Sequence, residues 1–91
     1  MIRSFKHRGL KRLYERGVES GVPPQMLAKL RVILADLDSA EGVRDMGRPG
    51  YGLHLLRGDR KNFWSVKVTN NFRVIFRFEK EPSDDDMVDY H

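Results

Sequence analysis

The most constraining feature of the chain is an alternation of apolar and polar side chains in its second half. Apolar residues occupy every other position from Phe72 to Phe78, and Arg73 and Arg77 lie between them. Because successive side chains of a strand point to opposite faces of a sheet, this spacing predicts a strand over residues 71–78. The chain is therefore expected to fold around a sheet that buries one of its faces.

Two neighbouring runs extend this pattern. Trp64, Val66 and Val68 recur at the same spacing, and a weaker alternation over residues 51–57 precedes them. The turn-prone segments 58–61 and 69–71 separate the runs, which predicts an antiparallel meander. The predicted strands are residues 51–57, 62–69 and 71–78, with short strands over residues 2–5 and 87–90.

Two amphipathic helices are predicted ahead of this sheet. The first carries Leu10, Leu13 and Tyr14 at helical spacing and is expected to end at Gly17. The second follows Pro24, and its apolar stripe is formed by Leu27, Leu30, Ile33, Leu34 and Leu37. We therefore predict a single α+β domain over residues 1–91, with both N-terminal helices packed on one face of a mainly antiparallel sheet of four to five strands.

Two segments are expected to lie outside the helices and strands. The glycines and the proline of residues 42–52 suit turns, which predicts a loop. The acidic run Ser83-Asp84-Asp85-Asp86 is interpreted as a solvated turn.

The second face of the sheet is predicted to be basic. The alternation places Lys67, Arg73 and Arg77 opposite the apolar residues, and His54 is expected to join them. Residues 1–80 contain all 17 Lys and Arg but only eight of the 13 acidic residues, a net charge of +9, whereas the last eleven residues carry −5. A region with this much positive charge attracts polyanions such as nucleic acid. A solvent-exposed surface that binds no partner would explain the same charges.

The composition excludes several kinds of site. The chain has no cysteine, which rules out disulfides, thiol nucleophiles and thiolate metal ligands. The three histidines, His7, His54 and His91, lack the spacing of a zinc site, so we predict neither a metal nor another cofactor. No apolar run approaches the ~18 residues of a membrane span, and the N-terminus lacks the pattern of a signal peptide. We therefore expect no membrane contact and a cytoplasmic location.

The basic face carries the residue types that metal-free RNA cleavage requires. The reaction needs a base for the 2′-hydroxyl, a cation for the charge that develops on the phosphate, and an acid for the departing 5′-oxygen. Arg73 suits the phosphate because its fork of donors binds two oxygens at once. His54 suits proton transfer because imidazole exchanges protons near neutral pH. Tyr90 or His91 would complete the set.

Several short segments share one order and spacing over nearly the whole chain. They are residues 2–11, 37–40, 48–54, 56–60, 64–68 and 71–76, followed by the terminal Asp89-Tyr90-His91. In this combination the chain resembles the HigB toxins of bacterial toxin–antitoxin systems, also called plasmid maintenance killer proteins, of the RelE/ParE superfamily. Each segment alone is weak, whereas their order makes the combination specific. The resemblance implies a small RelE-like domain.

The resemblance also implies an mRNA interferase that enters the ribosomal A site and cleaves mRNA during translation. Its expected partners are the ribosome, mRNA and a helix-turn-helix antitoxin of the HigA type. DNA contact would occur only indirectly, through the antitoxin complex. The functional positions of the family fall here on His54, Asn71, Arg73, Asp89, Tyr90 and His91. Arg57 stands where the family commonly has lysine, which favours phosphate contact over proton transfer.

The predicted site therefore has two sets of residues. The catalytic set is His54, Arg73, Tyr90 and His91. The RNA-binding or supporting set is Arg57, Lys67, Asn71, Arg77 and Asp89. Asn71 also suits the turn after Asn70, so a turn role and a substrate role both stay open for it.

Two other functions are compatible with the same basic domain. A ParE-like toxin would bind and inhibit a protein such as DNA gyrase, and a simple RNA-binding module would need no catalysis. The histidines and the Asp89-Tyr90-His91 terminus speak against the gyrase inhibitor, whereas the basic face alone would satisfy the binding module.

Overall fold

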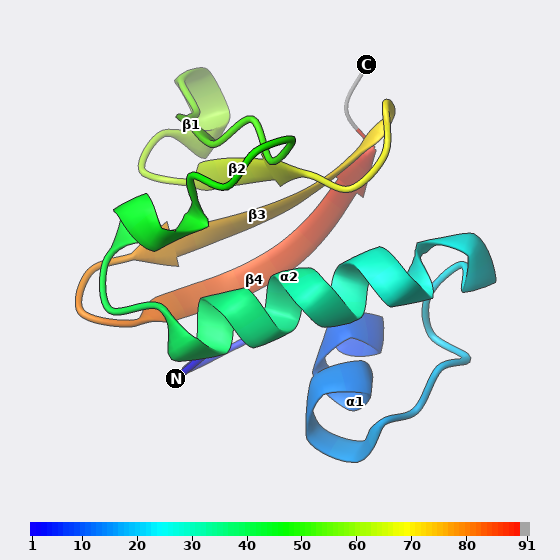
Figure 1. The fold of residues 1–91 in the computed structure, drawn as a ribbon. Helices are drawn as coiled ribbons and strands as arrows, with labels where there is room; N and C mark the ends of the chain where they lie inside the picture. The colour runs from blue at the N-terminus through cyan, green and yellow to red at the C-terminus, as the bar shows by residue number, and fades with distance from the viewer. Residues whose placement is uncertain (90–91) are drawn as a thin grey trace.

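The computed structural model describes residues 1–89, which form two α-helices and a four-stranded antiparallel sheet. The helices are α1 (Arg8–Arg16) and α2 (Leu27–Ser39), and the 3₁₀ turns are η1 (Pro24–Met26), η2 (Val43–Met46) and η3 (Gly58–Arg60). The strands lie side by side in the order β1 (His54–Leu55), β2 (Trp64–Lys67), β3 (Phe72–Phe78) and β4 (Pro82–Asp89). Figure 1 shows α2 crossing in front of the sheet, with α1 beneath α2. The predicted α+β fold is confirmed.

The sequence locates both helices correctly. At the start of α1, Nδ1 of His7 accepts a hydrogen bond from the Leu10 N–H at 3.1 Å. Gly17 ends this helix with a φ of +67°, a conformation that glycine adopts without strain. Pro24 opens η1, the turn that leads into α2. Among residues 1–89, no helix is long and apolar enough to cross a membrane.

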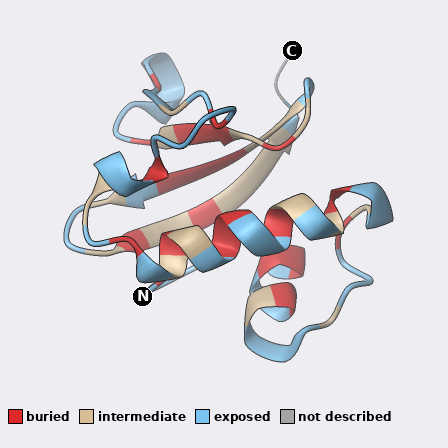
Figure 2. Cartoon of the chain, in the orientation of Figure 1, coloured by how far each residue is buried: buried red, intermediate tan, exposed pale blue. Residues whose placement is uncertain are grey.

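The core lies between the helices and the apolar face of the sheet, as Figure 2 shows by the buried residues on their facing sides. The helices contribute Leu10, Leu13, Leu30, Ile33, Leu34 and Leu37 to it, and the sheet contributes Val66, Val74 and Phe76. Trp64, Phe72 and Phe78 pack at its margin, which confirms the predicted alternation. Both helices therefore cover the same face of the sheet and leave the opposite face without a helix.

Residues 2–5 do not form the predicted strand. They run beside β4 and share only one parallel bridge with it, between Phe5 and Asp85. The Asp85 N–H donates to the Ser4 carbonyl at 3.1 Å. Asp84 has a φ of +55° at a register shift in β4, and this irregularity prevents a continuous ladder.

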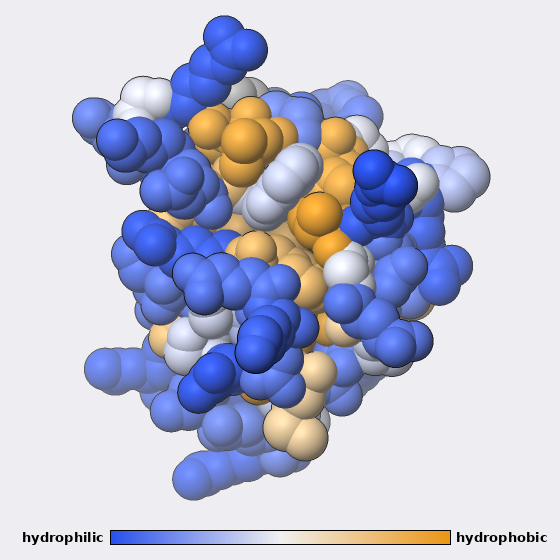
Figure 3. Space-filling model, turned by 90° about the vertical axis from the view of Figure 1, so that its left-hand side faces the viewer, coloured by the Kyte–Doolittle hydropathy of each residue, from blue (hydrophilic) through white to orange (hydrophobic). Residues whose placement is uncertain are grey.

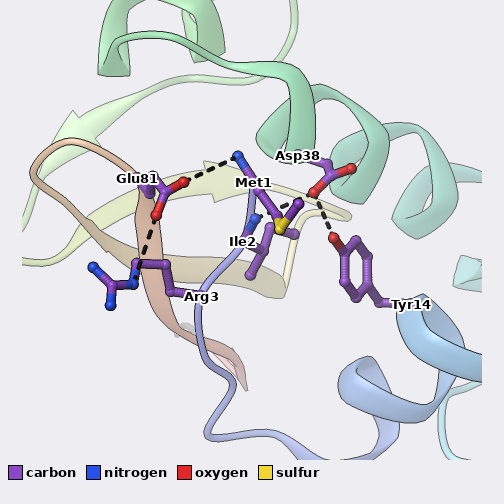
Figure 4. Close-up of polar contacts among 6 residues, drawn as sticks. All are labelled: Met1, Ile2, Arg3, Tyr14, Asp38 and Glu81. Atoms are coloured by element: carbon purple, nitrogen blue, oxygen red, sulfur yellow. Dashed lines mark hydrogen bonds and ion pairs between the residues drawn. The ribbon is translucent and has the colours of Figure 1, made fainter.

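One carboxylate of α2 anchors the N-terminal segment. Oδ1 of Asp38 accepts the Ile2 N–H at 3.2 Å and the Tyr14 hydroxyl at 2.5 Å (Figure 4). The Tyr14 hydrogen bond holds the pKa of Asp38 below its ordinary value, and the same bond raises the pKa of Tyr14 to about 12. Glu81 adds an exposed ion pair with Arg3 at 3.6 Å. The N-terminal segment, α1 and α2 are thereby joined by polar contacts.

The interpretation of residues 83–86 as a solvated turn is wrong, because these residues belong to β4. The turn between β3 and β4 lies earlier, at residues 79–81. Asp85 is fully buried, and burial together with the neighbouring Asp84 raises its pKa to about 8. Among residues 1–89, neither carboxyl oxygen of Asp85 has a hydrogen-bond partner. Such a group lowers the stability of the fold.

The strand predicted over residues 51–57 is also shorter than expected. Only His54 and Leu55 pair with β2. Gly52 precedes them with a φ of +57°, which interrupts the extended backbone. β1 is therefore a two-residue edge strand at the end of a loop.

The helix-free face of the sheet is less uniformly basic than the sequence predicts. Leu56, Phe63 and Ile75 form a small second core there, with Val88 packed against it. The alternation assigned Ile75 to this face correctly, but its burial required partners from two other segments. The basic residues therefore surround an apolar centre.

Candidate active site

The register of the sheet places the predicted site residues in two neighbouring rows on the helix-free face. In the first row, His54 lies opposite Ser65, which lies opposite Ile75. In the second row, Lys67 lies opposite Arg73. Residues two apart along a strand share a face, so the rows are adjacent. An imidazole from β1 and cations from β2 and β3 thus lie on one surface.

Gly52 brings His54 and Arg73 close to the same backbone segment. Its carbonyl oxygen lies 2.9 Å from Nδ1 of His54. A Cβ added to Gly52 would lie 3.9 Å from a terminal nitrogen of Arg73. The left-handed φ of +57° favours glycine at this position. The imidazole and the guanidinium therefore converge on one glycine.

The contact with Gly52 favours one tautomer of His54. A carbonyl oxygen only accepts hydrogen bonds, so the Nδ1 that faces it is the donor. In that tautomer Nε2 carries the lone pair, as a general base requires. His54 is exposed on the edge strand, which gives a substrate access to it.

Lys67 and Arg73 place two positive charges at directly paired positions. Like charges opposite each other in an antiparallel pair destabilise a sheet. Both side chains are half-buried, and within residues 1–89 no ion pair from Lys67 is recorded. Paired cations suit a phosphate, whose oxygens accept hydrogen bonds from more than one donor.

A pocket opens beside His54. Its volume is about 590 Å³, and its lining residues are His54, Leu55, Leu56, Arg57, Asp59 and Arg60. Leu55 is 50% exposed, so it adds accessible apolar surface to the lining of this pocket. Figure 3 shows apolar atoms gathered in one area of a hydrophilic face of the molecule. The pocket thus offers apolar surface for a nucleobase and, through Arg57 and Arg60, positive charge for a phosphate.

Known proteins resemble this chain over most of its length. A family model described as the RelE-like toxin of type II toxin–antitoxin system HigB matches residues 3–91. The chain belongs to this family. It is also similar to endoribonuclease HigB of Proteus vulgaris, with 46% identity over 78 residues that cover 86% of this chain and 85% of the relative. The resemblance noted in the sequence is confirmed, and membership of a type II system implies an antitoxin partner.

In this HigB-like toxin, Asn71 and Asp89 lie at the same end of the sheet as Arg73. Asn71 belongs to a turn closed by Thr69, whose hydroxyl accepts the N–H groups of Asn71 at 3.3 Å and Phe72 at 3.1 Å. Asp89 pairs with Phe72 at the end of β4. The turn role of Asn71 is thus observed, whereas RNA-binding roles for Asn71 and Asp89 stay predictions.

Tyr90 and His91 lie outside the described residues, so their predicted catalytic roles stay predictions. Within residues 1–89, no three side chains of metal-ligating type lie together in a way that could hold an ion.

Arg77 lies apart from the other predicted RNA-binding residues. Its Nε lies 3.5 Å from Asp84, and its guanidinium carbon lies 5.1 Å from the ring centroid of Phe63. Four positions separate it from Arg73 along β3, roughly 13 Å in an extended strand. Contacts within the protein therefore explain Arg77 better than RNA binding does.

The sequence analysis missed residues that support the HigB-like site. The role of Gly52 could have been predicted from the sequence, because a glycine beside a strand often marks a place where another group approaches the backbone closely. Asp59 lines the pocket but was considered only as part of a turn. Tyr51 donates a hydrogen bond to Asp36 at 2.5 Å, and no sequence pattern links these two residues.

Proposed function

We propose that this HigB-like toxin is a metal-independent endoribonuclease that cleaves mRNA on the ribosome. The 2′-hydroxyl of one nucleotide attacks the adjacent phosphorus, and the bond to the 5′-oxygen of the next nucleotide breaks. The products are a 2′,3′-cyclic phosphate and a 5′-hydroxyl. The convergence of His54 and Arg73 on Gly52 is the observation that carries this proposal. Family membership and the similarity to an endoribonuclease support it.

His54 acts as the general base in this mechanism. In the tautomer that donates from Nδ1 to the Gly52 carbonyl, Nε2 takes the proton from the 2′-hydroxyl. Arg73, next to Lys67, stabilises the charge that develops on the pentavalent phosphorus. Arg57 binds a neighbouring phosphate at the pocket.

The C-terminal residues supply the remaining functions. His91 protonates the departing 5′-oxygen, and Tyr90 stacks on a base or assists the proton transfer. Asp89 orients these two residues, and Asn71 holds the substrate or the catalytic histidine. These residues are included because they match the family's motif.

Cleavage depends on the ribosome in this proposal. A site with few proton-transfer groups gains greatly from a substrate that is held in attack geometry, and the A site supplies that geometry. A second basic surface is suited to ribosomal RNA, since α1 exposes Arg8, Lys11, Arg12 and Arg16. Free RNA is therefore cleaved poorly.

The antitoxin partner is of the HigA helix-turn-helix type in this proposal. The toxin acts in the cytoplasm, where translating ribosomes are found. It reaches DNA only through the antitoxin, which carries the DNA-binding motif.

Primer extension on cellular transcripts after induction of the toxin tests the proposed function. The nuclease produces new 5′ ends within translated regions, and these ends do not form when translation of the same transcript is blocked. A DNA-damage response without mRNA breaks would instead identify a gyrase inhibitor. Growth inhibition with neither response would identify a binding module.

Arg73→Ala is expected to slow cleavage by about tenfold to a hundredfold, because a hydrogen bond to a charged phosphate contributes about 1.5–3 kcal/mol. Arg73→Lys restores only part of the rate, because lysine lacks the bidentate fork. Arg77→Ala is the matched control on the same strand and is expected to cleave at nearly the parent rate. Rate constants on ribosome-bound mRNA provide the comparison. Equal losses for Arg73→Ala and Arg77→Ala would contradict the placement of the phosphate.

A further inference from the structure

Hydrogen bonds hold both the side chain and the backbone of Tyr51. Its hydroxyl donates to Oδ2 of Asp36 on α2 at 2.5 Å, and its carbonyl oxygen accepts the Lys67 N–H of β2 at 2.7 Å. The residue is only 3% exposed, and Nζ of Lys29, also on α2, lies 4.6 Å from the centroid of its ring. Tyr51 thereby ties the loop before β1 to both layers of the fold.

Asp36 anchors the other end of the same turn. Nε of Arg48 lies 3.1 Å from the oxygen that accepts the Tyr51 hydroxyl. The Tyr51 N–H donates to the Arg48 carbonyl at 3.0 Å and closes the turn. Burial, together with the bond to Asp36, raises the pKa of Tyr51 to about 12, so its hydroxyl remains a donor at neutral pH. One carboxylate of α2 therefore holds both ends of this turn.

The anchored residue is followed directly by the glycine that contacts His54. The Gly52 carbonyl accepts the Nδ1–H of His54 at 2.9 Å, with only Leu53 between them in the chain. Peptide units are planar, so a carbonyl has a defined direction only where the neighbouring backbone is held. Gly52 has no side chain with which to hold itself. Of the two residues bonded to Gly52, Leu53 packs against the main core and Tyr51 is held by hydrogen bonds, so both restrict the direction of this carbonyl.

We propose that Tyr51 and Asp36 are positioning residues that orient the imidazole of His54 through the Gly52 carbonyl. This inference rests on the proposed role of His54 as the general base. It extends the site to α2, on the opposite side of the sheet from His54. A displacement of about 1 Å at a reacting group lowers a rate by up to about a hundredfold, so loss of the anchor affects the chemical step.

The protein contains a matched control for this inference. Tyr14 donates to Asp38 of α2 at 2.5 Å, the same chemistry two residues along the helix, but this bond holds α1 rather than the loop before β1 (Figure 4). Tyr51→Phe and Tyr14→Phe each remove one hydroxyl and one bond to a carboxylate. Both are expected to lower the Tm by roughly 10 °C.

Only Tyr51→Phe is expected to change catalysis. The single-turnover rate constant on ribosome-bound mRNA falls by about tenfold to a hundredfold. The toxin concentration at half-saturation stays unchanged, because Lys67 and Arg73 keep their places in the sheet. Tyr14→Phe retains the rate constant and the half-saturating concentration of the parent toxin.

Nitrogen-15 NMR of the imidazole supplies a readout that a structural role would not change. Parent toxin and Tyr14→Phe show the Nδ1–H tautomer of neutral His54, whereas Tyr51→Phe shows a mixture of both tautomers. Asp36→Asn retains an oxygen that accepts the Tyr51 hydroxyl, and Asp36→Ala does not. Asp36→Asn is therefore expected to cleave faster than Asp36→Ala, which tests the anchor even if Tyr51→Phe fails to fold.

The possible failures are distinguishable. The positioning role would be overturned if Tyr51→Phe cleaved at the parent rate and showed the parent tautomer while His54→Ala stayed inactive. Equal cleavage rates for Asp36→Asn and Asp36→Ala would also overturn it. Parent cleavage by His54→Ala would instead overturn the proposed function on which this inference rests.

Discussion

Replacing His54 by alanine is expected to slow mRNA cleavage by about 10²- to 10⁴-fold, the usual contribution of one general acid or base. The side chain is exposed on an edge strand and makes no part of the main core, so the variant is expected to fold. His91→Gln is predicted to have a similar effect on the acid step. Both variants should therefore relieve toxicity without loss of soluble protein.

His7→Ala is a control for the loss of an imidazole elsewhere. His7 caps α1 through its bond to the Leu10 N–H, so its removal lowers stability by about 0.5–2 kcal/mol and leaves cleavage at the parent rate. Single-turnover cleavage of ribosome-bound mRNA measures all three variants. Parent rates for both His54→Ala and His91→Gln would show that the site is assigned to the wrong residues.

Replacing Asp85 by asparagine is expected to stabilise the toxin, increasingly so as the pH rises. Burial and the neighbouring Asp84 raise the pKa of Asp85 to about 8 in the folded protein, above the ordinary value of 3.8 that applies after unfolding. Between these values the folded state keeps a proton that the unfolded state releases. The stability of the parent therefore falls as the pH rises from about 4 to about 8, by at most about 1.4 kcal/mol per pH unit. An asparagine side chain does not titrate, so the stability of the variant does not fall with rising pH for this reason.

Urea unfolding of Asp85→Asn and parent toxin across this pH range measures the effect. The neighbouring Asp84 is present in both proteins, so the difference between the two isolates Asp85. Asp86→Asn removes a neighbouring charge that is not fully buried and should show no such trend. A constant difference between parent and Asp85→Asn from pH 4 to pH 8 would contradict a buried, protonated Asp85.

Much of the fold was predictable because burial imposes a period on the sequence. The alternation around Val66, Val74 and Phe76 located β2 and β3 and sorted their side chains onto the correct faces. Helical spacing and a terminal glycine located α1 in the same way. These signals are local and need no knowledge of which segments meet.

The errors arose where a tertiary contact overrides local composition. The strand predicted over residues 87–90 found only the end of β4, because the acidic run of Asp84, Asp85 and Asp86 does not alternate and hid its first part. The left-handed residues Asp84 and Gly52 interrupt strands at positions that periodicity does not mark. The interruptions at Asp84 and Gly52 are irregular backbone conformations, which are determined by contacts with neighbouring segments.

The candidate site was predictable in its residue types but not in its geometry. Residue chemistry and the family's motif indicated His54 and Arg73. The convergence of these residues on Gly52 depends on a register and a loop conformation that only the structure defines. The contact between Tyr51 and Asp36 joins segments 15 residues apart, and neither residue has a distinctive sequence context.

The most direct test of the central claim is cleavage of a ribosome-bound mRNA in which the nucleotide 5′ to the cleaved bond lacks its 2′-hydroxyl. We expect no cleavage at that bond, normal toxin binding, and fragments ending in a 2′,3′-cyclic phosphate from the unmodified message. Cleavage of the deoxy-substituted bond at the parent rate, leaving a 3′-hydroxyl and a 5′-phosphate, would contradict attack by the 2′-hydroxyl.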